Sequence, residues 1–207
     1  MYTMKKILSI KILTIIFFLS GCASTYKPIR PQTLNYTAKN EDDGVFFAYK
    51  YDVLAEKGNA KYAKREDKRD VKVIAVKLTN NTDRVLNTVD DLQFYAGSRS
   101  IFLLDPLTIK NTIKQPVPIY LLYLLLSFTN IYVTNNNSTQ VYPIGLALGP
   151  GISVGNMVVA GSANTNFFDE LSEYNIINYN LQPGETIFGI IGTGGINYDP
   201  LHVKIKE

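Results

Sequence analysis

Cysteine, histidine and tryptophan are almost missing from this sequence. One cysteine among 207 residues excludes a disulfide within the chain and a zinc site built from cysteines. One histidine, His202, excludes a cluster of histidine ligands, and it stands on an expected solvent face of the last strand. We therefore predict no metal site, no cofactor and no catalytic residues, and we expect that the protein is not an enzyme.

Excess positive charge is also lacking once the amino-terminal segment is set aside. The formal net charge is +3, but Lys5, Lys6 and Lys11 all precede residue 22. The remaining chain has 18 basic and 18 acidic residues. Nucleic-acid affinity depends mainly on neutralising phosphates, so the neutral balance predicts no nucleic-acid partner.

The chain begins with a short apolar segment behind those lysines. The apolar run Ile12–Leu19 covers eight residues, whereas a helix needs about 20 to cross a bilayer. Positive residues followed by a short apolar run are typical of a signal peptide. We assign residues 1–21 to a signal peptide rather than to a membrane anchor.

The segment ends in Leu19, Ser20, Gly21 and Cys22, and this order resembles the lipobox of bacterial lipoproteins. The resemblance implies cleavage before Cys22 and acylation of its sulfur, so the lipid bilayer becomes a partner through acylated Cys22. It also implies a place in the bacterial cell envelope. Ala23 is not the aspartate that retains such proteins in the inner membrane, which favours the outer membrane, facing the periplasm.

Two stretches of the remaining chain read as irregular. Residues 22–43 contain Pro28 and Pro31 and show no apolar period, so they predict a tether before a domain over residues 44–207. Residues 56–70 carry six basic and four acidic side chains, and we expect a solvated loop there.

Short strands dominate the rest of that domain. Residues 71–79 predict a central strand, because Ile74, Val76 and Leu78 share one face while the opposite face is also apolar. Aromatic and β-branched residues, alternation and turn signals predict strands at residues 45–51, 71–79, 85–89, 92–95, 100–104, 176–181, 186–191 and 201–206.

Two turns carry a second resemblance. The run from Val76 to Leu86 around Asn80-Asn81, then Asp90-Asp91-Leu92, and the later run Leu181–Gly189 are similar to the immunoglobulin-like modules of bacterial lipoproteins. The expected fold is therefore mainly β, an immunoglobulin-like antiparallel β-sandwich with an apolar helical hairpin insertion. Such modules imply a non-catalytic binding or structural role with an envelope protein as partner.

The insertion, residues 115–168, contains no charged residue over 54 positions. Its first apolar part predicts a helix through Leu121, Leu122, Leu124, Leu125 and Leu126. In the second part, Gly145 with Gly149 and Gly151 with Gly155 are spaced by four, so each pair would let a neighbouring backbone approach. Pro150 is expected to break or kink this second arm, and Asn166 to cap a short helix that follows.

Three interpretations of the insertion remain open. The hairpin covers the sandwich as part of its core, or it enters the membrane at residues 116–162, or it forms a groove for a partner's apolar segment. The membrane interpretation makes the protein a membrane-inserting component of an envelope assembly. A β-hairpin over residues 130–134 and 139–144 is the alternative to helix at the tip.

Overall fold

A computed structural model describes residues 21–135 and 138–206. Leu19 and Ser20 of the lipobox lie outside these residues. The chain divides into two compact units. We call the described residues before Tyr26 together with 116–162 the hairpin unit, and residues 26–115 with the described part of 163–207 the sheet unit.

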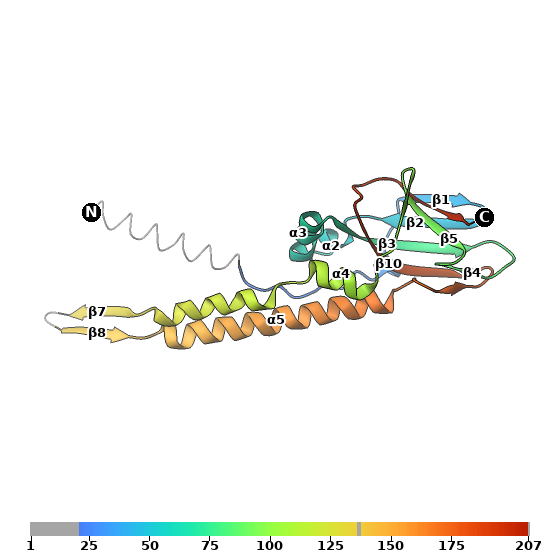
Figure 1. Cartoon of the computed structure of the whole chain (residues 1–207). Coiled ribbons are helices and arrows are strands. Elements are labelled where there is room, and N and C mark those ends of the chain that lie inside the picture. Colours follow the sequence, from blue (N-terminus) through green and yellow to red (C-terminus); the bar gives the residue numbers. More distant parts are fainter. Residues whose placement is uncertain (1–20, 136–137, 207) are drawn as a thin grey trace. The chain divides into compact units, whose positions relative to one another are not determined.

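The sheet unit contains two main antiparallel sheets and a short strand pair (Figure 1). Its elements are η1 (Pro31–Thr33), β1 (Ala38–Asp42), β2 (Val45–Lys50), α2 (Val53–Glu56), α3 (Ala60–Arg69), β3 (Val71–Asn80), β4 (Leu86–Asn87), β5 (Leu92–Ala96), β6 (Arg99–Ile101), α4 (Pro106–Ile113), the end of α5 (Gly145–Glu173), β9 (Asn180–Leu181), β10 (Thr186–Gly194) and β11 (Leu201–Ile205). One sheet has the order β1-β2-β3-β10, the other has the order β11-β5-β6, and β4 pairs with β9.

Both faces of strand β3 are apolar, as its sequence predicted, and each face packs in a different core. Ile74, Val76 and Leu78 pack with residues of β2, β5 and β11 in the core between the two sheets. Val71, Val73 and Ala75 face the second core, where helices α2, α3, α4 and α5 cover the first sheet. Because β3 is flanked by β2 and β10, it is the central strand that its two-sided apolar pattern indicated.

The expected strands are present, although several are shorter than predicted. Strand β9 covers only two of the six residues expected at 176–181. The Asn80 turn forms as predicted, since the Asn80 side-chain oxygen accepts the Thr82 amide at 2.9 Å. Gly184 has φ of 75° in the turn before β10, the conformation that its position after Pro183 requires.

The helix content of the structure is higher than the expected fold class allows, so the fold class is corrected. Helices make up 36% of the structure and strands 32%, so the protein is mixed α/β rather than mainly β. Residues 56–70, expected as a solvated loop, form the end of α2 and all of α3. The helix is stable here because Tyr62 and Glu66, four residues apart, are buried on one face while the remaining charged side chains lie on the other.

The expected tether is also folded from Tyr26 onward. Strand β1 pairs with β2 from Ala38 to Asp42, and the side chains of Tyr26 and Ile29 are buried in the second core. The sheet unit therefore begins at Tyr26 and not at residue 44.

Pro150 was expected to break or kink the second arm; helix α5 is continuous from Gly145 to Glu173, so the arm does not break there. The missing amide of Pro150 removes one intrahelical hydrogen bond near the amino-terminal end, which a helix of 29 residues tolerates. Asn166 lies inside this helix and caps nothing. Phe167 and Leu171, four residues apart in this helix, are both buried.

Candidate functional site

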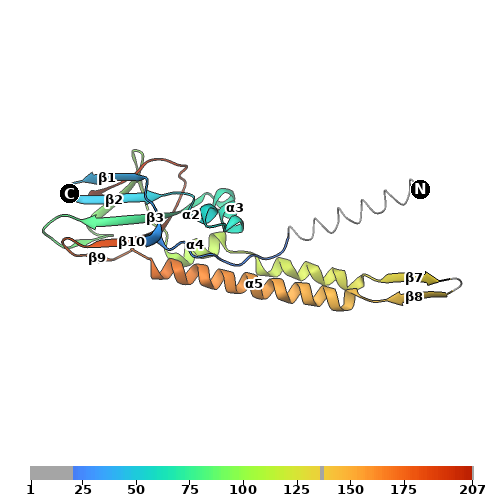
Figure 2. The same cartoon turned by 180° about the vertical axis from the view of Figure 1, so that it is seen from behind.

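The uncharged insertion forms a hairpin whose two arms run side by side (Figures 1 and 2). The first arm is η2 (Val117–Phe128), a 3-10 helix, and the second is the part of α5 before residue 163. Beyond the helices the chain continues as β7 (Ile131–Asn135) and β8 (Ser138–Tyr142), which pair antiparallel. The tip is thus the β-hairpin that we treated as the alternative, and the helical expectation for these residues is wrong.

The two glycine pairs have different surroundings. A Cβ atom at Gly145 would lie 2.7 Å from the Thr129 amide nitrogen, and one at Gly149 would lie 2.8 Å from that of Ser127. Gly145 and Gly149 therefore allow the close backbone approach that their spacing predicted. A Cβ at Gly151 or Gly155 meets nothing within 4 Å, so the same prediction is wrong for this second pair.

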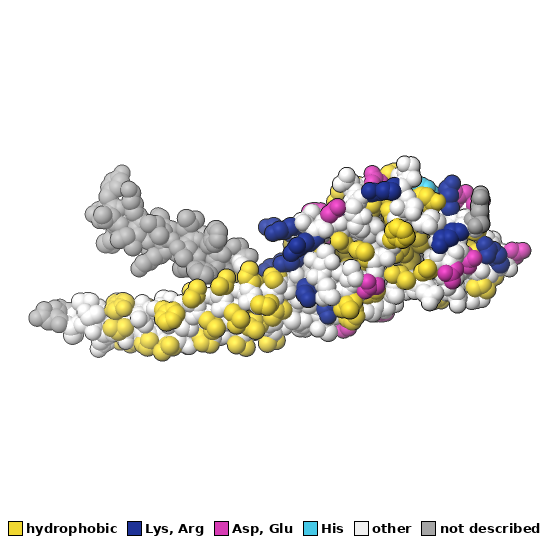
Figure 3. Space-filling model, viewed as in Figure 1, with side chains coloured by type: hydrophobic (Ala, Val, Ile, Leu, Met, Phe, Trp, Pro, Cys, Tyr) yellow, Lys and Arg dark blue, Asp and Glu magenta, His cyan; other side chains and the backbone are white. Residues whose placement is uncertain are grey.

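Most large apolar side chains of the hairpin are exposed. Its buried core consists of Tyr120, Tyr123 and Ala160, with a few partly buried neighbours that include Leu126. The predicted contact residues are exposed by 47% at Leu121, 63% at Leu122, 41% at Leu124 and 66% at Leu125. In Figure 3 apolar side chains, in yellow, lie along the hairpin, and the charged side chains are gathered on the sheet unit. The hairpin unit itself therefore leaves these apolar side chains largely uncovered.

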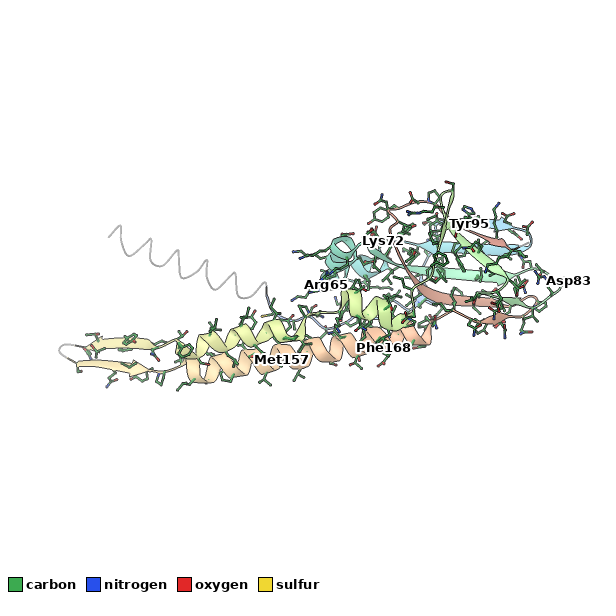
Figure 4. The ribbon with its side chains drawn as sticks, viewed as in Figure 1. Arg65, Lys72, Asp83, Tyr95, Met157 and Phe168 are labelled. Carbon is green, nitrogen blue, oxygen red and sulfur yellow. The ribbon has the colours of Figure 1, made fainter. Side chains whose placement is uncertain are left out.

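Within the described residues, α5 is the one helix whose length and composition would allow it to cross a membrane. Its last eleven residues are unsuited to lipid, because they include Asp169, Glu170 and Glu173 and bury Phe167 and Leu171 in the sheet unit. The apolar part that remains accessible is the arm of the hairpin, whose surface includes Met157 (Figure 4).

The expected lipidation site lies on this hairpin. The backbone amide of Ala23 donates to Asn156 Oδ1 at 2.5 Å, and the Asn156 side-chain amide donates to the Ile152 carbonyl at 2.8 Å. The side chain of Tyr123 forms a hydrogen bond with that of Cys22. Ala23 also packs against the hairpin core. Cys22 is therefore held between the two arms, partway along them, and its thiol is half-buried.

Glu170, which binds the segment around Ile29, was not identified from the sequence. Its buried carboxylate accepts hydrogen bonds from the Tyr26 hydroxyl, from the Ile29 amide at 2.9 Å and from the Arg30 amide at 2.8 Å. Burial, together with the Glu170 carboxylate, raises the pKa of Tyr26, so this hydroxyl stays protonated and donates. The segment from Tyr26 to Arg30 is thereby fixed within the sheet unit.

The sheet unit offers little that resembles a reactive site. An open pocket of about 320 Å³ is lined by Arg30, Gln32, Asp169 and Glu173 among others. Among the described residues, no group of three or more histidine, cysteine or acidic side chains is placed to hold a metal ion. His202 stacks on Tyr95 with the ring centroids 5.0 Å apart (Tyr95 is labelled in Figure 4).

Comparison with protein families, with characterised proteins and with solved structures finds no match for this chain. A functional interpretation therefore depends on the geometry described above.

Proposed function

We propose that this protein is a lipid-anchored, non-catalytic component of a bacterial cell envelope whose apolar hairpin enters the membrane that holds its acyl chains. The observation that carries the proposal is the position of Cys22 between the hairpin arms. Acyl chains attached at Cys22 would enter the bilayer beside the hairpin, so one membrane would receive both. The lipid also keeps the hairpin at the bilayer, which raises its effective concentration there.

The length of the hairpin beyond Cys22 suits this role. From Asn156 back to Gly145, α5 rises by about 17 Å at about 1.5 Å per residue. Beyond residues 143–144, strand β8 from Tyr142 to Ser138 adds about 14 Å at about 3.4 Å per residue. The total of roughly 30 Å equals the hydrocarbon thickness of a bilayer, which is also about 30 Å. The polar side chains of Thr134, Asn135, Ser138 and Thr139 would then reach the opposite headgroup region.

We also propose an immunoglobulin-like arrangement for the strands of the sheet unit. Strands β2, β3 and β10 pair as the first, second and fifth strands of such modules do, and β5 pairs with β11 in the other sheet as the third and sixth do. This likeness supports a module that binds or supports other envelope proteins.

We test membrane entry with two variants, each of which replaces one exposed phenylalanine with a charged aspartate. Phe128 in the hairpin is 81% exposed and Phe102 in the sheet unit is 82% exposed, so neither change removes a core contact. We expect the lipid-free chain that starts at Ala23 to float with liposomes. A charge in the bilayer core costs about 2.5–3.5 kcal/mol, so Phe128→Asp should weaken partitioning roughly 100-fold.

Phe102→Asp is the matched control and should float like the unchanged protein. The proposal is refuted if the unchanged lipid-free chain stays in the aqueous fraction. It is also refuted if Phe128→Asp and Phe102→Asp partition alike.

The anchor itself is tested by palmitate labelling of the full chain in a bacterial host. We expect label in the unchanged protein and none in Cys22→Ser. Equal labelling of the two proteins would overturn the lipid anchor.

A further inference from the structure

Strands β7 and β8 form an isolated two-stranded ladder at the tip of the hairpin. All ten side chains of the two strands are exposed. Within the part of the chain that the structure describes, no other strand pairs with either of them. A two-stranded ladder of this kind is marginally stable by itself in water. In lipid it is worse, because each unpaired backbone group there costs several kcal/mol.

The register shows which backbone groups are unpaired. Asn135 is paired with Ser138 across a connection of two residues, so this pair exchanges the hydrogen bonds nearest the turn. Hydrogen-bonded and non-bonded pairs alternate along the ladder. The amide and carbonyl groups of Tyr132, Thr134, Thr139 and Val141 therefore point outward, along the two free edges of the hairpin.

Neither edge carries the features that usually prevent strand addition. Exposed edge strands are normally protected by lysine, proline, bulges or inward-facing charges. Strands β7 and β8 contain no charged residue and no proline, and their five pairs run without a bulge. The strands are also rich in β-branched and aromatic residues, including Ile131, Val133 and Tyr142, which favour extended pairing.

We propose that β7 of one copy of this protein pairs with β8 of a second copy, so that the hairpin tips assemble into a closed β-structure in the membrane. This inference rests on the proposed membrane entry. Lipid at Cys22 gives every copy the same orientation and nearly the same depth, so equivalent hairpins meet in register. A second copy is therefore the partner that matches both the depth and the antiparallel direction of a free edge.

Closure follows from the type of contact. Pairing of β7 with β8 is heterologous, because two different edges meet, and such contacts form a ring when the rotation from one copy to the next closes. A barrel that closes in a membrane has about eight strands or more, and each copy supplies two. We therefore expect rings of about four or more copies. In each copy, the apolar residue pairs of the β7–β8 ladder lie near the helices, and the polar pairs lie near the turn.

Thr134→Pro is the variant that isolates the outer edge. The Thr134 amide points away from β8, so proline removes a donor to the second copy and leaves the ladder within the hairpin intact. Val133 is already extended, as the residue before a proline must be. Thr134→Val keeps the amide and the β-branched shape, and it serves as the matched control.

The acylated full-length protein is purified in mild detergent, and its mass is measured by light scattering. We expect assemblies of about four or more copies for the unchanged protein and for Thr134→Val, and single copies for Thr134→Pro. Single copies of the unchanged protein overturn the inference, as do equal assemblies of all three proteins.

Liposome flotation of the lipid-free proteins tests membrane entry separately from self-pairing. We expect Thr134→Pro to float like the unchanged chain, because it adds no charge. Flotation without assembly overturns the self-pairing alone. Loss of flotation in the unchanged chain overturns membrane entry, and the self-pairing in the membrane falls with it.

Discussion

Glu66 makes the stability of the sheet unit depend on pH in the neutral range. Its side chain lies on α3, is 4% exposed, and accepts the Val73 amide at 2.6 Å through Oε1. Burial raises the pKa of this carboxyl from 4.5 to about 7. The Val73 hydrogen bond and the Lys72 charge oppose the rise, while Asp67 and Asp52 add to it.

The sign of the effect follows from proton binding. Between pH 4.5 and pH 7 the folded protein holds a proton on Glu66 that the unfolded chain has released. The stabilisation is therefore complete below pH 4.5 and is lost as the pH rises through 7. Each step of one in pKa corresponds to about 1.4 kcal/mol, so the loss at Glu66 amounts to about 3 kcal/mol.

Glu66→Gln measures this contribution directly. Glutamine keeps the acceptor for the Val73 amide and carries no charge, so the variant should match the unchanged protein at pH 5. At pH 8 it should be more stable by up to about 3 kcal/mol. The assay is urea denaturation of the lipid-free chain at pH 5, 6, 7 and 8, followed by circular dichroism.

Glu56→Gln is the control, because Glu56 forms an exposed ion pair with Lys50 at 2.7 Å. Such surface pairs contribute about 0–1 kcal/mol, so the control should follow the unchanged protein at every pH. A difference between Glu66→Gln and the unchanged protein that stays constant from pH 5 to pH 8 would refute the reasoning.

Two further predictions concern packing and anchoring. Gly149→Ala should destabilise the hairpin by about 1–3 kcal/mol, since its Cβ would crowd Ser127, whereas Gly155→Ala faces open space and should stabilise α5 by up to about 1 kcal/mol. Hydrogen exchange of the α5 amides measures both, and equal protection in the two variants would contradict the packing. Glu170→Ala should cost about 2–4 kcal/mol, because three donors lose their acceptor. Chymotrypsin should then cut the segment before β1, after Tyr26, Leu34 or Tyr36, faster than in Asp169→Ala, whose side chain is exposed; equal cutting rates would contradict the anchor.

Strands could be predicted because their signal is local. The alternation in residues 71–79 contains both faces of β3, and the turn residues around Asn80 and Gly184 fix where the neighbouring strands end. Helix α3 was missed for a related reason. Its buried face consists of only two residues, Tyr62 and Glu66. Their helical spacing does not stand out among the neighbouring charged residues, so the sequence showed no helical period.

Contacts between distant residues explain the remaining differences. Nothing near Ile29 in the sequence indicates that Glu170 accepts its amide, so the segment after Cys22 reads as a tether. Nothing near Cys22 indicates Asn156 either, although the contact between Ala23 and Asn156 holds this segment on the hairpin. At the tip, apolar composition favoured helix over strand, and the β-branched residues of β7 decided otherwise.

The clamp at Glu170 also has a consequence for biogenesis. Ile29 precedes Glu170 by 141 residues, so in a chain exported amino end first the Ile29 segment emerges long before the carboxylate that holds it. If Cys22 is the lipidation site that we propose, its acylation and the cleavage before it can take place during that interval. On that proposal, lipid attachment would precede the last folding step of the sheet unit, the capture of the Ile29 amide by Glu170.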